Sequence, residues 1–163
     1  MKLSDGVEAA IHCVTMLAVL DEERVLSGAA LAEFHGVSAS YLLKHLKALS
    51  RSGVLKSVPG PTGGYRLGKP PHEITLLDVV LAVEGPEPAF RCKEIRRNGP
   101  NPLPDNAFPA PCGISAAMLG AERVYRAALR ETLISDLISQ HLATSDPRLN
   151  QRGCAFVALN QRP

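Results

Sequence analysis

Residues 37–67 read VSASYLLKHLKALSRSGVLKSVPGPTGGYRL, and this stretch decides the fold of the N-terminal half of the chain. Ser38 is a good N-cap for a helix. Apolar side chains then recur at helical spacing on one face, at Leu42, Leu46 and Leu49. The first half of the stretch therefore predicts a capped amphipathic helix with one buried face and one exposed face.

A shorter helix is predicted directly before this stretch. Ser27 can cap it, Leu31 and Phe34 would face inward, and Gly36 follows at a position that favours a left-handed residue. Two helices joined by a tight turn that contains glycine form the layout of a helix-turn-helix. An ordinary helical corner is the alternative interpretation of the same pattern.

The second half of the stretch predicts a hairpin. Strand-like runs at 54–58 and 65–67 flank the sequence PGPTGG at 59–64, whose glycines and prolines favour a turn. A hairpin that follows a recognition helix is a wing, and glycines at its tip would let the backbone approach a phosphate. The alternative is a hairpin that only closes the core.

The charge pattern of this region favours a polyanion as partner. The whole chain is nearly balanced, with 18 Lys and Arg against 16 Asp and Glu, yet no acidic residue occurs between Glu33 and Glu73. A surface with cations alone is the usual electrostatic footprint of a nucleic-acid site. A solvated basic face, or a protein–protein adaptor built on a winged helix, would explain the charges differently.

The predicted DNA-binding residues come from the second helix and from the hairpin. Side chains of the helix would enter the major groove, and His45 is a further candidate there. The hairpin would contact phosphate, with entry of Arg66 into the minor groove as the alternative. The complete set is Ser38, Ser40, Tyr41, Lys44, Lys47, Lys56, Gly63, Gly64 and Arg66.

Composition bounds the class of protein. Of the 163 residues, 45% are hydrophobic and 4% are aromatic, without tryptophan, so a helical core of aliphatic side chains is expected. No apolar run approaches the ~20 residues of a membrane span, and the N-terminus lacks a signal pattern. We expect a cytoplasmic protein without membrane contact, whose four cysteines are reduced, metal-bound or redox-active rather than structural disulfides.

The rest of the chain divides into four predicted parts. Residues 1–85 would form the winged helix-turn-helix domain, ending with a helix that Thr75 and Asp78 cap. Residues 86–113 hold seven of the 13 prolines and would form a functional loop. The last two predicted parts are a dimerisation helix and a flexible tail, over 114–143 and 144–163.

The predicted dimerisation helix carries an apolar stripe. Ile114, Met118, Ala121, Tyr125 and Ala128 recur at steps of four and three residues. The chain offers no second long helix to cover this stripe, so a second copy is the expected partner, as twofold DNA sites also favour. The alternative is that the helix folds back over the first helix. The fold class is thus mainly α, a winged helix-turn-helix with a two-stranded wing and a long C-terminal dimerisation helix.

Several of these motifs resemble the winged-helix regulators of the IscR, NsrR and RsrR family. The resemblance lies in Ser38 to Leu42, in Gly60 to Leu67 and in Ile74 to Leu76, and it extends over most of residues 1–140. It implies a homodimeric bacterial transcription regulator that binds double-stranded DNA and often carries an iron–sulfur cluster. The residues themselves argue against the rival of a cysteine-dependent enzyme, because no cysteine sits in a recognisable nucleophile motif. Better-known members have three closely spaced cysteines, whereas this chain has only Cys92 and Cys112 in that region.

Two further donors would be needed beside the two cysteines to hold a cluster. Glu8 and His12 lie at i and i+4 of the first helix, which stacks a carboxylate and an imidazole on one face. Alternatively, Glu8 belongs to a capping box that starts at Asp5, and His12 is a histidine with ordinary partners at an interface.

The RsrR-like branch is similar in having Glu and His on the first helix and two cysteines around a proline-rich loop. This resemblance implies a 2Fe–2S cluster with Glu8 and His12 from one subunit and Cys92 and Cys112 from the other, one per cross-subunit site and two per dimer. We therefore expect a redox sensor. The alternatives are a regulator switched by a Cys92–Cys112 disulfide or by a small effector, or zinc bound by the same four donors.

Overall fold

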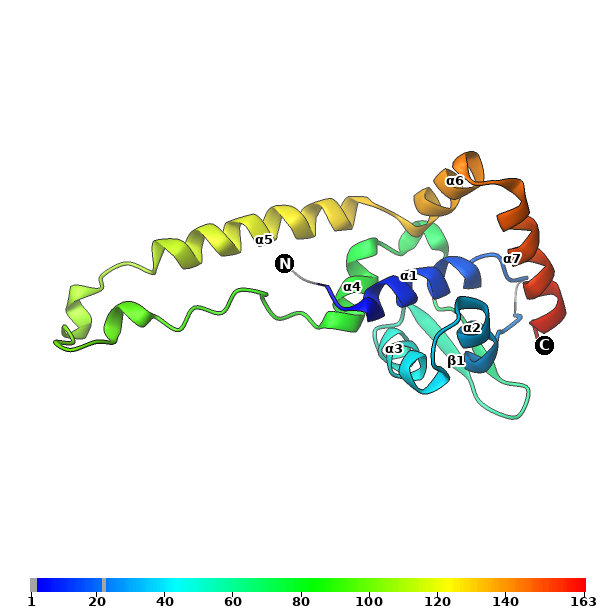
Figure 1. The fold of residues 1–163 in the computed structure, drawn as a ribbon, viewed down its shortest axis with the longest axis horizontal. Coiled ribbons are helices and arrows are strands. Elements are labelled where there is room, and N and C mark those ends of the chain that lie inside the picture. Colours follow the sequence, from blue (N-terminus) through cyan, green and yellow to red (C-terminus); the bar gives the residue numbers. More distant parts are fainter. Residues whose placement is uncertain (1–2, 22) are drawn as a thin grey trace.

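The computed structural model describes residues 3–21 and 23–163, so Met1, Lys2 and Glu22 lie outside the described part. The fold is mainly helical with one two-stranded antiparallel sheet, which confirms the prediction of a mainly α winged-helix fold with a two-stranded wing (Figure 1). In chain order the elements are α1 (Asp5–Leu17), α2 (Gly28–His35), α3 (Ala39–Arg51), β1 (Leu55–Val58), β2 (Gly64–Leu67), α4 (Leu76–Glu84), α5 (Gly113–Glu131), α6 (Ile134–Thr144) and α7 (Pro147–Asn160).

Helices α2 and α3 form the predicted helix-turn-helix. The Ser27 hydroxyl accepts a hydrogen bond from the Ala30 amide at 3.1 Å and so caps α2. Gly36 is left-handed, with φ of 64°, and it ends α2. The amide of Val37 then donates to the Ala32 carbonyl at 3.0 Å, which closes the turn before α3.

The wing is the antiparallel pair β1 and β2, in the register Leu55↔Leu67 to Val58↔Gly64. Its second strand also pairs with the segment before α2, because Leu26 and Tyr65 exchange backbone hydrogen bonds of 3.0 and 2.8 Å. These bonds attach the wing to the first helix of the helix-turn-helix.

The core lies between the first four helices. Helix α1 runs through the centre of the body and packs against α2, α3, α4 and α6 (Figure 1). The Thr75 and Asp78 capping box starts α4 as predicted. The largest fully buried side chains include Leu26, Leu31, Leu42, Leu46, Leu49, Ile74 and Ile134. The packing of these buried side chains keeps α1 and α3 in direct contact.

Residues 86–112 and α5 run side by side and project from the body as an arm (Figure 1). Near its base, the Glu122 carboxylate accepts from the Ala89 amide at 3.0 Å. The Arg126 guanidinium donates to the carbonyls of Pro86 and Glu87, both at 3.0 Å. The proline-rich segment is therefore attached to α5 rather than free.

The structure divides the single helix that the sequence predicts over 114–143. Helix α5 ends at Glu131 and α6 begins at Ile134, so that part of the prediction is wrong. The break arises because Leu133 pairs with Thr75 in an isolated bridge. The Thr132 carbonyl accepts from the Leu76 amide at 2.9 Å, and this contact with α4 replaces helical hydrogen bonds.

The C-terminal tail, residues 144–163, also differs from the prediction of a loose segment. It forms α7, which Asp146 caps through the Arg148 amide at 2.9 Å. Val157 of α7 is buried, and the centroid of the Phe156 ring lies 4.9 Å from that of the Phe34 ring of α2. These two apolar contacts dock the tail on the helix-turn-helix.

Candidate nucleic-acid interface and metal centre

Helix α3 presents the predicted DNA-reading side chains to solvent. Leu42, Leu46 and Leu49 face the core, and the opposite face exposes Ser38, Ser40, Tyr41, Lys44 and Lys47. The hydroxyls of Ser38 and Ser40 lie 2.9 Å apart and form a hydrogen bond. This face therefore offers hydroxyl, phenol and ammonium donors, which suit base edges and phosphates.

His45 is not available to a DNA groove. Its side chain is only 6% exposed and lies on the inner face of α3, against Gly6 of α1. The Tyr41 ring packs edge-on against the imidazole, with ring centroids 4.8 Å apart. His45 thus belongs to the support of the recognition helix, and the prediction of a groove contact is wrong.

The wing residues differ in what surrounds them. Lys56 on β1 is exposed, whereas the Arg66 guanidinium forms an ion pair with Glu23 at 2.6 Å. A side-chain hydrogen bond from Arg66, followed by its charge, lowers the pKa of the Glu23 carboxyl. Arg66 would therefore have to exchange this partner for a phosphate.

Gly63 and Gly64 are required by close backbone packing. A Cβ atom on Gly63 would lie 2.1 Å from the Val58 carbonyl oxygen, and one on Gly64 would lie 2.3 Å from the Leu26 carbonyl oxygen. No such approach is possible for a residue with a side chain. Close packing alone thus explains why both positions are glycine, and this explanation does not depend on the predicted phosphate contact.

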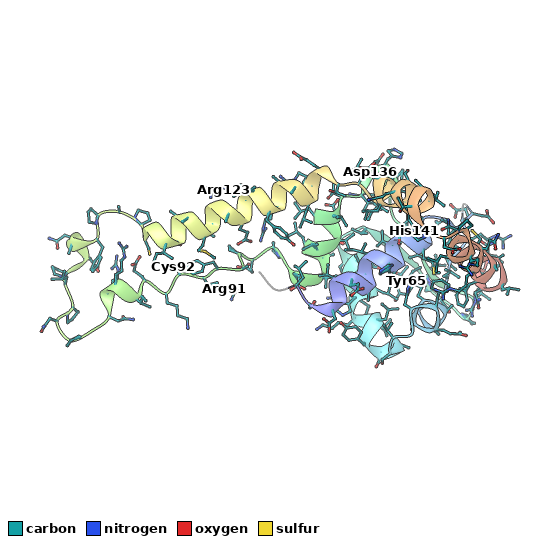
Figure 2. The ribbon with its side chains drawn as sticks, turned by 45° about the horizontal axis from the view of Figure 1, so that its top comes forward. Tyr65, Arg91, Cys92, Arg123, Asp136 and His141 are labelled. Carbon is teal, nitrogen blue, oxygen red and sulfur yellow. The ribbon has the colours of Figure 1, made fainter. Side chains whose placement is uncertain are left out.

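The Cys112 thiol lies beside the Cys92 thiol although 19 residues separate them in the chain. Cys92 lies on the arm (Figure 2). Cys112 occupies the N-cap of α5. The Ser115 and Ile114 amides of the first turn face its sulfur and, with the Cys92 thiol and the charge of Arg96, lower the pKa of the Cys112 thiol. A lowered pKa favours the thiolate, which is the form that binds metal or is oxidised.

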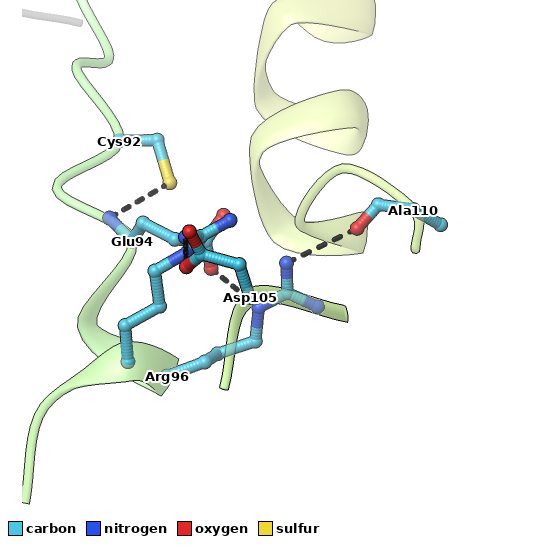
Figure 3. Close-up of polar contacts among 6 residues, drawn as sticks. Cys92, Glu94, Arg96, Asp105 and Ala110 are labelled. Carbon is cyan, nitrogen blue, oxygen red and sulfur yellow. Dashed lines mark hydrogen bonds and ion pairs between the residues drawn. The ribbon is translucent and has the colours of Figure 1, made fainter. Parts of the chain in front are cut away.

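Arg96 organises the loop around these cysteines. It pairs with Glu94 and donates to the Ala110 carbonyl at 3.3 Å, while the Glu94 amide donates to the Cys92 sulfur at 3.4 Å (Figure 3). Arg97 binds Asp105, and the guanidinium carbons of Arg96 and Arg97 lie 5.4 and 5.2 Å from the centre of the Phe108 ring. The loop is thus ordered by ion pairs and cation–π contacts. No sequence motif indicated this role of Arg96.

Glu8 and His12 are exposed one turn apart on α1. Ser4, and not Asp5, occupies the N-cap position of α1, so Glu8 lies too far along the helix for the alternative role in a capping box at Asp5. The centroid of the His12 ring lies 5.7 Å from that of His35, the last residue of α2. Both candidate donors therefore face outward from the body, and the imidazole lies beside the helix-turn-helix.

The two pairs of candidate donors do not meet within one chain. Among residues 3–21 and 23–163, no group of three or more His, Cys, Asp or Glu side chains is placed to hold a metal ion. Cys92 lies out on the arm, whereas α1 lies in the body (Figure 2). One chain thus provides a pair of sulfur donors and a separate pair of nitrogen and oxygen donors.

A helix-turn-helix followed by a two-stranded wing, with hydroxyls and cations exposed on the second helix, defines a winged-helix regulator. The chain belongs to the Rrf2 family of iron-dependent transcriptional regulators, which it matches over residues 3–140. The family consists of regulators and not of enzymes.

One curated relative and two solved structures illustrate what the chain is similar to. The chain is 43% identical over 98 residues to YffB of Lactococcus lactis, whose name describes it as an HTH-type transcriptional regulator. The match covers 60% of this chain and 63% of the length of YffB. CymR of B. subtilis, a global cysteine regulator, has a similar fold, with a TM-score of 0.65 at 24% identity over 86% of this chain and 98% of that one. IscR of T. potens is similar with a TM-score of 0.64 at 20% identity over 90% and 93% of the two chains.

No helix within residues 3–21 and 23–163 combines the length and the apolar character that crossing a bilayer requires.

Proposed function

We propose that the chain is a homodimeric, DNA-binding transcription regulator that senses redox state through 2Fe–2S clusters held between its subunits. Glu8 and His12 of one subunit would hold each cluster with Cys92 and Cys112 of the partner subunit. The observation that carries this proposal is the separation of two complementary donor pairs within each chain. A second copy of the chain would supply to each pair the donors that it lacks.

The chemistry of the donors fits an iron–sulfur cluster. Thiolates are its natural ligands, and nitrogen donors can replace them at one iron. The first turn of α5 stabilises the Cys112 thiolate, and Arg96 brings a positive charge near both sulfurs. Glu8 and His12 are exposed, and neither side chain forms a hydrogen bond or ion pair with another side chain of the described residues. Each pair is thus accessible to a ligand from outside the chain.

The exposure of α5 supports a dimer. Helix α5 packs on α4 near the body, not back over α1. Its predicted stripe stays exposed except at the half-buried Tyr125, with Ile114 at 68% and Met118 at 46%. Exposed apolar stripes on a long helix are typical of interfaces between subunits. We infer that residues 114–131 form the dimer interface and that 86–113 form the cluster-binding loop.

The same helix that carries Glu8 and His12 contacts both helices of the DNA-binding motif. His12 lies beside His35 at the end of α2, and Gly6 lies against His45 of α3. The bound cluster would supply one-electron redox chemistry, and its charge would act on the residues that hold it. A displacement of α1 would therefore reach α3, and with it Lys44, without an intervening element.

Anaerobic purification tests this function. We expect a coloured protein with iron and acid-labile sulfide, and loss of both in Glu8→Ala, His12→Ala, Cys92→Ala and Cys112→Ala. Cys154→Ala and His141→Ala are matched controls, because Cys154 and His141 are exposed residues of α7 and α6 outside the proposed site.

DNA affinity is measured on the same preparations with a duplex that the wild-type protein selects from a random-sequence library. The oxidised and reduced proteins should differ in affinity by about 5- to 150-fold, the usual range of coupling between two sites. Lys44→Ala should weaken binding in both states. Equal affinities in the two states would eliminate redox control.

A second candidate is a switch without a cluster. The proximity of the Cys92 and Cys112 thiols and the lowered pKa of Cys112 favour a reversible disulfide, formed when the two thiols lose two protons and two electrons to an oxidant. A colourless protein, free of iron under anaerobic conditions, whose DNA affinity changes with thiol oxidation would support this candidate.

A further inference from the structure

The C-terminal segment lies outside the family match, yet it is part of the DNA-binding half of the molecule. The match ends at residue 140, and α7 begins at Pro147. Helix α7 packs on α2 through Phe156, and the guanidinium of Arg152 lies 5.1 Å from the centre of the Phe34 ring. The family resemblance therefore assigns no role to a segment that covers the first helix of the helix-turn-helix.

After α7 the chain turns toward the wing and pairs with the segment that carries it. The Arg162 amide donates to the Val25 carbonyl at 2.9 Å, and the Val25 amide donates to the Arg162 carbonyl at 3.0 Å. Val25 precedes Leu26, which pairs in turn with Tyr65 of β2. The backbone of Arg162 is thus fixed to the segment of Val25 and Leu26, which is itself paired with the wing.

The Arg162 side chain reaches the wing loop itself. Its Nη1 donates to the Pro61 carbonyl at 3.3 Å, in the PGPTGG turn between β1 and β2. A guanidinium has five N–H donors, so most of them remain available. Within residues 3–21 and 23–163, no carboxylate forms an ion pair with Arg162, whereas Arg66 of the same wing is paired with Glu23 at 2.6 Å.

We propose that Arg162 binds a phosphate of the DNA backbone beside the wing and so extends the DNA-binding surface beyond the family fold. This inference rests on the proposed DNA binding. The ligand chemistry is a phosphodiester, which a guanidinium can bind with two parallel hydrogen bonds. Because the backbone of Arg162 is already fixed and its Nη1 is held at the Pro61 carbonyl, only the remaining freedom of the side chain is lost when the contact forms.

The test is the salt dependence of DNA binding by the full-length protein and its charge variants, Arg162→Lys, Arg162→Ala and Arg162→Glu. The probe is the duplex that the wild-type protein selects from a random-sequence library. The plot of log affinity against log salt should lose about 0.9 of its slope for each phosphate contact removed by Arg162→Ala. Arg162→Lys should keep the slope, and Arg162→Glu should weaken binding further.

The same three substitutions at Arg148 provide the matched control. Arg148 is an exposed cation at the other end of α7, about 20 Å away at the rise of an α-helix. Unlike Arg162, it forms an ion pair with Asp146 at 2.6 Å, so it controls for a change of net charge and not for the loss of an unpaired cation. Its variants should bind DNA like the wild type. Thermal unfolding of every variant checks that α7 remains docked, and the charge-conserving Lys variant separates lost charge from lost structure.

The outcomes separate this inference from the function on which it rests. If the wild-type protein binds the duplex and Arg162→Ala keeps its salt slope, Arg162 contacts no phosphate and the inference is wrong. An equal loss of slope for Arg148→Ala would also overturn it, because the effect would then be one of net charge. A wild-type protein that selects and binds no duplex refutes the DNA-binding function itself.

Discussion

His45 is buried between the recognition helix α3 and Gly6 of α1. It is 6% exposed, and its Nε2 atom is buried without a hydrogen-bond partner among the described residues. Burial, followed by the charge of Lys44, lowers the pKa of its imidazole, while Glu84 of α4 acts in the opposite direction. We therefore expect His45 to be neutral at neutral pH in the folded protein.

A pH dependence of stability follows from this lowered pKa. The unfolded chain binds a proton at His45 near the ordinary pKa of 6.5, and the folded chain resists it. Neutral His45 makes its full contribution to the free energy of unfolding above pH 6.5. This contribution is lost as the pH falls from 6.5 through the lowered pKa of the folded protein. His45→Gln, which keeps a polar side chain without a titrating group, should flatten the profile of unfolding midpoint against pH over this range. Parallel profiles for variant and wild type would contradict the assignment.

At the scale of residues, the sequence predicts which side chains are exposed on α3 but not which of them are already paired. The stretch from 34 to 72 contains no acid, so Arg66 looks like a free cation in the sequence. Glu23 reaches it from outside that stretch because Leu26 pairs with Tyr65, and this pairing depends on the folded wing. The sequence can pair Glu8 with His12 on one face because helical spacing is local, whereas the contact of Arg162 with Pro61 joins residues 101 positions apart.

At the scale of elements, the contact of α1 with α3 depends on one glycine. A Cβ atom at Gly6 would lie 2.3 Å from Cε1 of the His45 ring. Gly6→Ala should therefore force the two helices apart and reduce the free energy of unfolding by about 1–3 kcal/mol, as overpacked cores do. Chemical denaturation measures this, and DNA binding should weaken because α3 is displaced.

Gly153 of α7 provides the control for Gly6→Ala. A Cβ atom at Gly153 would meet nothing within 4 Å, so Gly153→Ala should raise stability by about 0.5–1 kcal/mol through helix propensity alone. If both variants gained stability, the proposed tight contact between α1 and α3 would be wrong.

The sequence predicts the elements of the body better than those of the C-terminal half. Caps and glycine turns are local signals, so Ser27, Gly36 and the pair of Thr75 and Asp78 marked their helices correctly. The division between α5 and α6 is not local, because it depends on the pairing of Leu133 with Thr75. An apolar stripe that continues across such a break looks like one helix in the sequence.

At the scale of the whole molecule, the arm separates the sulfur donors from the body that carries Glu8 and His12 (Figure 2). A site completed by a second copy would report on the position of one subunit relative to the other. It would also hold the arm, whose loop is already ordered by Arg96 and Phe108, against α1 of the partner. The proposed sensing thus depends on the dimer and not on the isolated chain.

Mixed dimers test whether the donors of one cluster come from different subunits. One chain carries Glu8→Ala and His12→Ala, its partner carries Cys92→Ala and Cys112→Ala, and two affinity tags isolate the mixed species. If the site is shared, one of the two sites in this dimer remains complete, and we expect half the iron and sulfide of the wild type. Each doubly substituted homodimer should contain none.

The control places all four substitutions in one chain and pairs it with a wild-type chain. A shared site predicts the loss of both clusters in this dimer, because every site then lacks one pair of donors. A site formed within each chain predicts the opposite result for the two mixed dimers, with half the iron in the control and none in the test. Since both dimers carry the same four substitutions, a general loss of stability cannot reproduce the difference between them.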